Sequence, residues 1–255
     1  MTGTSALDIR GLVFSYPEKP GAIDSIDLSI ARGEKVGVIG PNGSGKTTLF
    51  LLAAGVLRPD HGNISIGGAP IVPGRFNPAI GMVFQDPDDQ LFCPSVEEDI
   101  GFGPANTGLH PDRIGALVRD SMQRFGVAHL ASRPPHHLSG GEKRLVTMAA
   151  VSAMSPEIIL YDEPDASLDS RSRRSLIGFL SESGETLLVA SHDLELVLEV
   201  CPRVVIVDQG RIVADGSSRE LMSDERLMTS HGLEKPHSLA HHSPENGHSH
   251  SISAD

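Results

Sequence analysis

Eight consecutive residues near the start of the chain form a pattern whose chemistry is phosphate binding. The pattern is G-x-x-x-x-G-K-[ST], and it consists of Gly40, Pro41, Asn42, Gly43, Ser44, Gly45, Lys46 and Thr47. Glycines let the backbone curl until successive N–H groups face phosphate oxygens, and the positive end of a following helix adds to this attraction. The Lys46 ammonium can reach the outer phosphates, and the Thr47 hydroxyl can bind Mg²⁺. These residues predict a nucleotide site.

Two acids end a separate apolar run and are candidates for the reaction itself. The run is IILYD, in which Asp162 follows aliphatic residues and a tyrosine, and Glu163 comes next. The Asp162 carboxylate can hold Mg²⁺, directly or through water. Neighbouring side chains on a strand point to opposite sides, so Glu163 is free to act as a general base on an attacking water. The two motifs together predict an NTPase without specifying which kind.

Strands and helices must alternate along the chain to bring these motifs together. Residues 7–16 and 25–30 alternate apolar and polar side chains, as strands of a half-buried sheet do. Residues 35–39 form an apolar run that predicts a strand buried on both faces, directly before the glycine-rich loop. Later apolar runs alternate with helical segments and end in a hairpin that turns at residues 208–210. This order predicts an α/β fold with a parallel sheet, interrupted by a mostly helical insert over residues 86–153.

The composition limits the kinds of partner. The chain has 255 residues, of which 21 are Lys or Arg and 33 are Asp or Glu, so its net charge is −12. A general nucleic-acid binder needs an excess of basic residues, so we expect no nucleic-acid partner. The first residues do not resemble a signal peptide, and no apolar stretch approaches the roughly 18 residues of a membrane span. The chain has only two cysteines, Cys93 and Cys201, which is typical of a cytoplasmic protein.

A third motif makes the sequence resemble a known family. Residues 138–142 are LSGGE, which is similar to the signature of ATP-binding-cassette ATPases. The resemblance covers roughly residues 7–225 and implies an α/β P-loop NTPase core with an antiparallel β subdomain and an inserted helical subdomain that carries the signature. It implies an ATPase domain over residues 1–230, with ATP and Mg²⁺ as its cofactors. It also implies a dimer, expected to contain two identical chains, in which Ser139, Gly140 and Gly141 of one copy face the ATP held by the other.

Other positions match landmarks of this family. Gln85 matches a glutamine that touches Mg²⁺ and the attacking water, and His192 matches a histidine that contacts the γ-phosphate. Tyr16 matches an aromatic residue that stacks on adenine, with a packed edge-strand aromatic as the alternative. Residues 167–169 match a loop that crosses the dimer interface. The resemblance implies that the catalytic residues are Glu163, His192, Lys46 and Gln85. It implies that Mg²⁺ is bound by Thr47, Gln85 and Asp162. It implies that ATP is bound by Tyr16, residues 40–47, Thr48 and the signature of a second copy.

The sequence departs from the family pattern in three places, but none of these departures removes a catalytic group. Glu142 stands where glutamine is common, and Tyr161 stands where an aliphatic residue is common. The sequence Asp165-Ala166-Ser167 replaces the frequent Thr-Ala-Gly. We therefore expect the chain to be active.

Three kinds of cassette protein compete for this sequence: a transporter subunit, a DNA-repair or chromosome ATPase, and a ribosome-acting protein. Repair and chromosome ATPases carry a long coiled coil between the phosphate loop and the signature, whereas Lys46 and Ser139 lie only 93 positions apart (139 − 46) without sustained heptads. Ribosome-acting members usually carry two cassettes in one chain, and this chain has one. The resemblance therefore favours a transport ATPase at the cytoplasmic face of the membrane, bound there by separate transmembrane subunits.

The segment over residues 83–109 narrows the class of transporter. It resembles the corresponding segment of energy-coupling-factor ATPases, particularly the cobalt/nickel type. Residues 86–99 hold six acids and no Lys or Arg. They predict either a solvated acidic loop or a patch that docks a basic helix of the transmembrane partner.

The end of the chain is rich in histidine. Six of the twelve histidines follow Ser230, and the surrounding residues are mainly polar, so residues 231–255 are expected to form a disordered tail. Imidazole is a ligand suited to nickel, cobalt, zinc and copper, so the tail is either a weak metal-binding segment or a polar tail with incidental histidines. Together with residues 83–109, it favours cobalt or nickel ion as the imported substrate. The alternatives are a vitamin or, less favoured, a soluble ABC ATPase outside transport.

Overall fold

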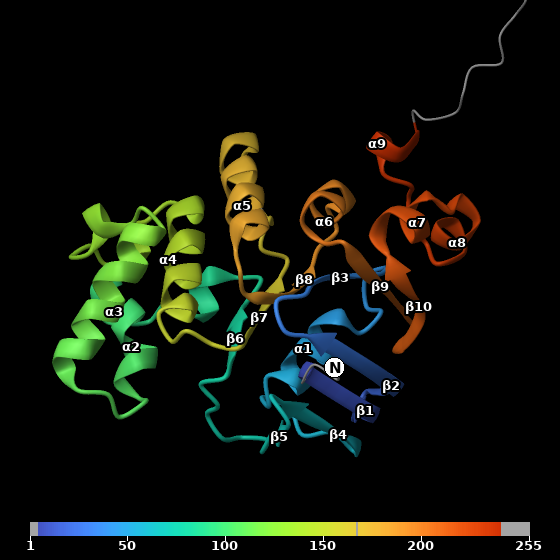
Figure 1. Ribbon diagram of the computed structural model, residues 1–255, viewed down its shortest axis with the longest axis horizontal. Helices are drawn as coiled ribbons and strands as arrows, with labels where there is room; N and C mark the ends of the chain where they lie inside the picture. Colours follow the sequence, from blue (N-terminus) through green and yellow to red (C-terminus); the bar gives the residue numbers. More distant parts are fainter. Residues whose placement is uncertain (1–4, 167, 241–255) are drawn as a thin grey trace, which may run out of the picture.

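The computed structural model describes residues 5–166 and 168–240, and it contains two β-sheets (Figure 1). Buried side chains from both sheets belong to one hydrophobic cluster. The first sheet is antiparallel, in the order β2-β1-β4-β5. Its strands are β1 (Ser5–Tyr16), β2 (Lys19–Ala31), β4 (His61–Ile66) and β5 (Ala69–Pro70). The alternation of apolar and polar residues in β1 and β2 is the reason that one face of this sheet is buried and the other is not.

The second sheet has the order β10-β9-β3-β8-β7-β6, and its strand pairs are parallel except for the antiparallel pair of β9 with the edge strand β10. The strands are β3 (Lys35–Ile39), β6 (Ile80–Val83), β7 (Ile158–Asp162), β8 (Thr186–Ala190), β9 (Arg203–Asp208) and β10 (Arg211–Ser217). The central strands are buried along nearly their whole length and mostly apolar, because both of their faces are covered. The predicted α/β fold with a parallel sheet is confirmed.

Helices cover both faces of the second sheet. Helix α1 (Lys46–Ala53) lies between the two sheets, where Leu49 and Phe50 are fully buried. Helices α5 (Ser170–Glu182) and α6 (Leu194–Val200) cover the opposite face, as Figure 1 shows. Since β3, β6, β7 and β8 are parallel, their carboxyl ends meet at one edge of the sheet.

The insert between β6 and β7 is helical, as predicted. Between residues 86 and 153, all of which are described, every regular element is a helix. These elements are η1 (Pro87–Asp89), α2 (Val96–Ala105), α3 (Pro111–Arg124), η2 (Ala128–Leu130), η3 (Pro135–His137) and α4 (Gly140–Ser152). The helices α2, α3 and α4 pack together beyond the edge strand β6 (Figure 1). Polar side chains cap the starts of α2 and α4.

The chain continues after β10 with α7 (Ser218–Ser223), α8 (Glu225–Ser230) and α9 (His237–Ala240). Residues 231–240 belong to the segment for which the sequence predicts disorder, and polar contacts attach them to the core. The His231 Nδ1 atom lies 2.8 Å from an Asp208 carboxylate oxygen. The Ser238 N–H and hydroxyl donate to the Glu195 carboxylate at 3.0 and 2.6 Å. The four remaining histidines of the predicted metal-binding tail, from His241 to His250, lie outside the described residues.

Within residues 5–166 and 168–240, no helix is both long and apolar enough to cross a membrane.

Candidate functional site

The phosphate loop joins β3 to α1 and is pressed against two neighbouring strands. A Cβ atom on Gly40 would lie 2.0 Å from the Val207 carbonyl oxygen, and one on Gly45 would lie 2.8 Å from that of Ala22. Gly45 also has a φ of +115°, which side chains rarely tolerate. The Gly210 N–H, in the turn between β9 and β10, donates to the Ser44 carbonyl at 2.9 Å. The glycines are therefore required by close backbone approaches as well as by local curvature.

Helix α1 begins with a buried cation and no competing acid. The Lys46 ammonium donates to the Gly40 and Pro41 carbonyls at 2.8 and 3.1 Å. Burial lowers the pKa of Lys46, and the nearby carboxylates of Glu163 and Asp162 act against this. The first turn of α1 holds no acid, and its N-cap, Gly45, has no side chain to occupy the N–H groups. This helix start can accept an anion.

Three side chains from three neighbouring strands meet beside this loop. Glu163 follows β7 directly, and its carboxylate lies 3.1 Å from the Gln85 amide nitrogen and 2.8 Å from His192 Nε2. Gln85 comes two residues after β6, and His192 comes two residues after β8. The Glu163 backbone has a φ of +47° and donates to the Ala190 carbonyl at 2.8 Å. This uncommon conformation for a side-chain-bearing residue turns Glu163 away from the direction of β7.

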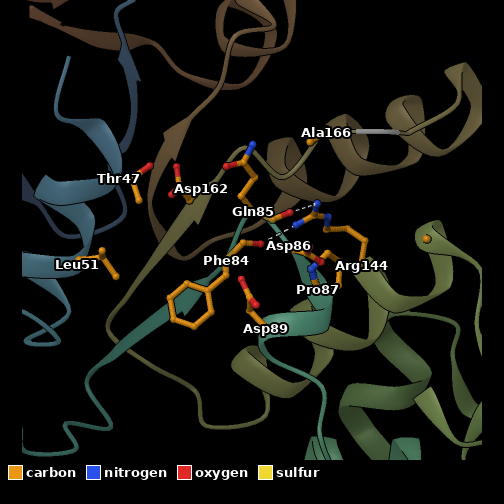
Figure 2. Close-up of a pocket in the computed structure, with 11 residues that line it drawn as sticks. Thr47, Leu51, Phe84, Gln85, Asp86, Pro87, Asp89, Arg144, Asp162 and Ala166 are labelled. Atoms are coloured by element: carbon orange, nitrogen blue, oxygen red, sulfur yellow. Dashed lines mark hydrogen bonds between the residues drawn. The ribbon is translucent and has the colours of Figure 1, made fainter. Parts of the chain in front are cut away.

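Asp162 and Thr47 offer oxygen ligands next to this cluster. The Asp162 side chain is 2% exposed, and its Oδ1 atom has no hydrogen-bond partner in the described parts of the chain. Burial raises the pKa of Asp162, whereas the neighbouring Thr47 side chain lowers it. Figure 2 shows Thr47 and Asp162 pointing toward one another, with Gln85 beside them. A buried, unpaired carboxylate oxygen close to a hydroxyl fits a hard cation such as Mg²⁺.

Most of the predicted site residues line one pocket of about 390 Å³. The predicted members that line it are Asn42, Gly43, Ser44, Gly45, Lys46, Thr47, Thr48, Gln85, Glu163 and His192. Tyr16 lies close by, with its hydroxyl 3.3 Å from the Thr48 hydroxyl and its ring edge-on to Phe14. The sequence interpretation missed Lys19, which also lines the pocket and donates to the Gly43 carbonyl at 2.8 Å. In the sequence, the only feature that could have indicated this role for Lys19 is its position three residues after Tyr16.

The predicted signature residues stand apart from this pocket. Ser139 caps α4, and Gly140 lines a neighbouring cleft of about 670 Å³ together with Thr47 and Gln85. The Ser139 N–H and hydroxyl both donate to the Glu142 carboxylate, at 2.8 and 2.9 Å. These bonds from Ser139 lower the pKa of Glu142. At the start of α4, the Glu142 carboxylate of the same chain therefore binds the N–H and hydroxyl groups of the N-cap residue Ser139.

The loop predicted to cross a dimer interface is only partly described. Ser167 lies outside the described residues. Asp169 caps α5, where its carboxylate accepts the Ser172 N–H at 2.7 Å. Asp169 therefore has a local role that is independent of any partner.

Four of the six acids in residues 86–99 are engaged within the chain. Asp86 caps η1, Asp88 pairs with Lys143, Glu98 accepts the Ser95 hydroxyl, and the buried Asp99 accepts the N–H groups of Phe92 and Cys93. The more prominent surface feature is apolar. A groove of about 480 Å³ is lined by Phe76, Phe92 and Phe102, which are 58%, 66% and 50% exposed. The sequence interpretation missed this groove because its walls come from separate segments.

Comparison with known proteins gives a consistent result. The profile of the ABC transporter family matches residues 23–166. An ABC transporter ATP-binding protein of Synechocystis is 50% identical over 92% of this chain and 82% of the relative. The energy-coupling factor transporter ATP-binding protein EcfA of Methanothermobacter thermautotrophicus is 40% identical over 90% of this chain and 76% of the relative.

A solved structure agrees with these relatives. CbiO1 from Clostridium perfringens, described as part of the ABC transporter complex cbiONQ, superposes with a TM-score of 0.77 at 34% identity. The match covers 89% of this chain and 94% of CbiO1.

Proposed function

Because this chain belongs to the ABC transporter family and is an ATP-hydrolysing subunit of the energy-coupling-factor and CbiO type, we propose that it powers import of cobalt or nickel ion through separate transmembrane subunits. The family uses ATP with Mg²⁺. The observation that supports hydrolysis by this chain is the Gln85, Glu163 and His192 cluster beside the phosphate loop. Two observations support a metal substrate: the resemblance of residues 83–109 to the cobalt/nickel type of energy-coupling-factor ATPase, and the histidines near the end of the chain.

We assign the following roles to the residues of the pocket. Residues 40–48 hold the phosphates through backbone N–H groups and the Lys46 ammonium, and Tyr16 stacks on adenine. Thr47, Gln85 and Asp162 would hold Mg²⁺, which would neutralise negative charge on the phosphates. Glu163 accepts a proton from the attacking water, while Gln85 and His192 orient it. Residues 139–141 of a second, identical copy complete the site from the other side.

The same proposal places the chain at the cytoplasmic face of the membrane, where the transmembrane subunits bind it. We propose that a helix of such a subunit docks in the groove lined by Phe76, Phe92 and Phe102. Support comes from the exposure of three aromatic side chains on one groove, which is unusual for a surface without a partner. The exposed Glu97 and Glu98 on α2 lie between Phe92 and Phe102 in the sequence. Their negative charges favour a partner helix that carries basic residues at its ends.

Uptake by cells tests the substrate. Cells that lack this protein are complemented with the wild-type chain or with Glu163→Gln, and entry of cobalt, nickel and a set of labelled vitamins is measured. We expect only the wild-type chain to restore metal uptake, with vitamin uptake unchanged. Restoration of vitamin uptake without metal uptake would contradict the metal assignment and support the vitamin alternative.

The purified protein tests the site itself. Glu163→Gln should reduce ATP hydrolysis by at least about 100-fold, yet still bind ATP and accumulate as a dimer. Glu157→Gln is the matched control, since Glu157 precedes the other end of β7 and pairs with Arg32 on the surface. Near-normal hydrolysis by Glu163→Gln would reject Glu163 as the base.

Charge reversal and apolar truncation test the docking groove. Phe92→Ser combined with Phe102→Ser should prevent co-purification with the transmembrane subunits while leaving ATP binding intact. Glu97→Lys combined with Glu98→Lys should weaken assembly less. If both double variants assemble and transport normally, the groove is not the docking site.

A further inference from the structure

A buried arginine connects the start of the insert's last helix to the backbone of Gln85. Arg144 lies on α4, five positions after Ser139, and is 4% exposed. Its guanidinium donates to the Phe84 carbonyl at 2.7 Å and to the Gln85 carbonyl at 2.6 Å. Figure 2 shows these two bonds reaching from Arg144 across to the segment that follows β6.

Burial of the Arg144 cation costs desolvation free energy, so the hydrogen bonds that it makes require an explanation. Burial lowers the pKa of Arg144, and the charges of Asp165 and Asp86 only partly offset this. Its Nε atom has no hydrogen-bond partner among residues 5–166 and 168–240. An apolar side chain at this position would avoid the desolvation cost, so packing alone does not explain an arginine. Its distinctive ability is that a planar guanidinium can bridge two successive carbonyls, which a single ammonium cannot do equally well.

The two carbonyls bracket the backbone from which the Gln85 side chain extends. That side chain donates to Glu163 at 3.1 Å. By fixing the carbonyls of residues 84 and 85, Arg144 restricts the backbone torsions that set the direction of the Gln85 amide. Because α4 is a rigid element, the same contact links the Gln85 amide to the helix start at Ser139, about 7.5 Å along the helix axis.

We propose that Arg144 is a positioning residue, which holds the Gln85 amide at Glu163 and makes that placement depend on the position of α4. This inference rests on the proposed function, because it assumes that Gln85 and Glu163 act in hydrolysis. Displacement of α4 relative to β6 then moves Gln85, while the phosphate loop keeps its own contacts.

A double-mutant cycle tests whether Arg144 acts through Gln85. ATP hydrolysis by the full chain is measured for Arg144→Met, Gln85→Ala and the combined variant. We expect Arg144→Met to lower kcat by about 10-fold or more, as misplacement of catalytic groups does, with little change in the KM for ATP. In the Gln85→Ala background, Arg144→Met should lower kcat by no more than about twofold, because residues that act as a unit are not additive.

Two further variants separate positioning from general stability. Arg144→Lys should recover only part of kcat, since one ammonium cannot hold both carbonyls in the same geometry. Arg203→Met is the control, because Arg203 makes comparable charged bonds to Glu34 and Asp215 away from Gln85. It should lower the melting temperature without changing kcat at a temperature where the protein remains folded. If Arg144→Met does not fold, the cycle is carried out with Arg144→Lys.

The outcomes are distinguishable. Near-normal kcat in Arg144→Met, or losses that multiply fully in the combined variant, would overturn the positioning role. If Glu163→Gln and Gln85→Ala also hydrolyse ATP normally, the proposed site itself is wrong. If those two lose activity and Arg144→Met does not, only the inference about Arg144 fails.

Discussion

Helices α1 and α4 both begin where the proposed function requires a phosphate group, but their first turns are built differently. The start of α1 has a glycine N-cap, no acid in its first turn and the buried Lys46 beside it. The start of α4 has a serine N-cap and a glutamate that accepts two hydrogen bonds from that serine. The first turn of α1 leaves its N–H groups to a ligand, whereas α4 satisfies some of the polar groups at its start with its own Glu142 side chain.

The start of α1 is therefore a preformed half of the nucleotide site, whereas the half at the start of α4 must first be exposed. The α1 half is shaped by close backbone contacts within one chain, so it should bind nucleotide without a partner. At α4, an incoming phosphate must compete with the Glu142 carboxylate for Ser139. We therefore expect the α4 half to contribute only when a second copy brings its nucleotide close, which makes closure of the dimer sensitive to small changes there.

The largest expected difference between the two helices is in the loss of stability when a methyl group is added at the start of each. Gly45→Ala places a Cβ 2.8 Å from the Ala22 carbonyl at a φ of +115°, and should lower the free energy of unfolding by about 3 kcal/mol. Gly140→Ala meets no atom within 4 Å and should change it by less than about 0.5 kcal/mol. Urea unfolding followed by circular dichroism measures both. Equal destabilisation would show that the two starts are under the same constraint.

A second comparison removes one lysine from each helix. Lys46→Ala deletes a charged donor to phosphate, worth about 1.5–3 kcal/mol, and should weaken ATP binding by roughly 10- to 100-fold. Lys143→Ala, on α4, removes a cation that pairs with Asp88 and should leave ATP affinity of the single chain unchanged. Titration calorimetry at a protein concentration below dimerisation provides the measurement. A loss of affinity in Lys143→Ala would mean that α4 already contributes to binding in one chain.

The smallest effect concerns the charge at the start of α4. Glu142→Gln keeps an acceptor for Ser139 but removes a negative charge from the helix start. In the Glu163→Gln background it should strengthen ATP-dependent dimerisation by about two- to fivefold. Sedimentation velocity measures the dimer. Weaker dimerisation in this variant would show that the carboxylate assists closure.

The pH dependence of stability provides a check on the same carboxylate. Hydrogen bonds from Ser139 lower the pKa of Glu142 below its ordinary 4.5. The stabilisation by the charged form is therefore complete above about pH 4.5 and is lost as the pH falls through the lower folded-state pKa. Thermal unfolding between pH 5 and pH 3 should show a smaller loss of stability in Glu142→Gln than in the wild-type chain.

Much of the pocket follows from local patterns in the sequence. The eight-residue phosphate loop, Gln85, Glu163 and His192 each come at the end of an apolar run that predicts a buried strand. Carboxyl ends of parallel strands meet at one edge of a sheet, so residues far apart in the sequence were expected to converge, and they do. Lys19 and Arg144 were missed because neither belongs to such a pattern.

The acids of residues 86–99 show why composition alone was misleading. As a string of letters they are an unpaired negative segment, but Asp99 is buried under the N–H groups of Phe92 and Cys93, and Asp88 pairs with Lys143 from α4. The polar residues after Ser230 were likewise expected to be disordered. Ser238 instead finds a carboxylate at Glu195, more than forty positions earlier in the chain.

The sequence alone determined the fold class and the chemistry of the phosphate loop, because strand periodicity, glycine conformational freedom and the reach of a lysine act over a few neighbouring residues. Only the tertiary structure decided that Arg144 bridges to Gln85, that Asp88 pairs with Lys143 and that three phenylalanines share one groove. Hydrogen bonds and burial between these groups depend on which distant segments pack together. The role of a buried cation or carboxylate therefore depends on the partner that packing brings next to it.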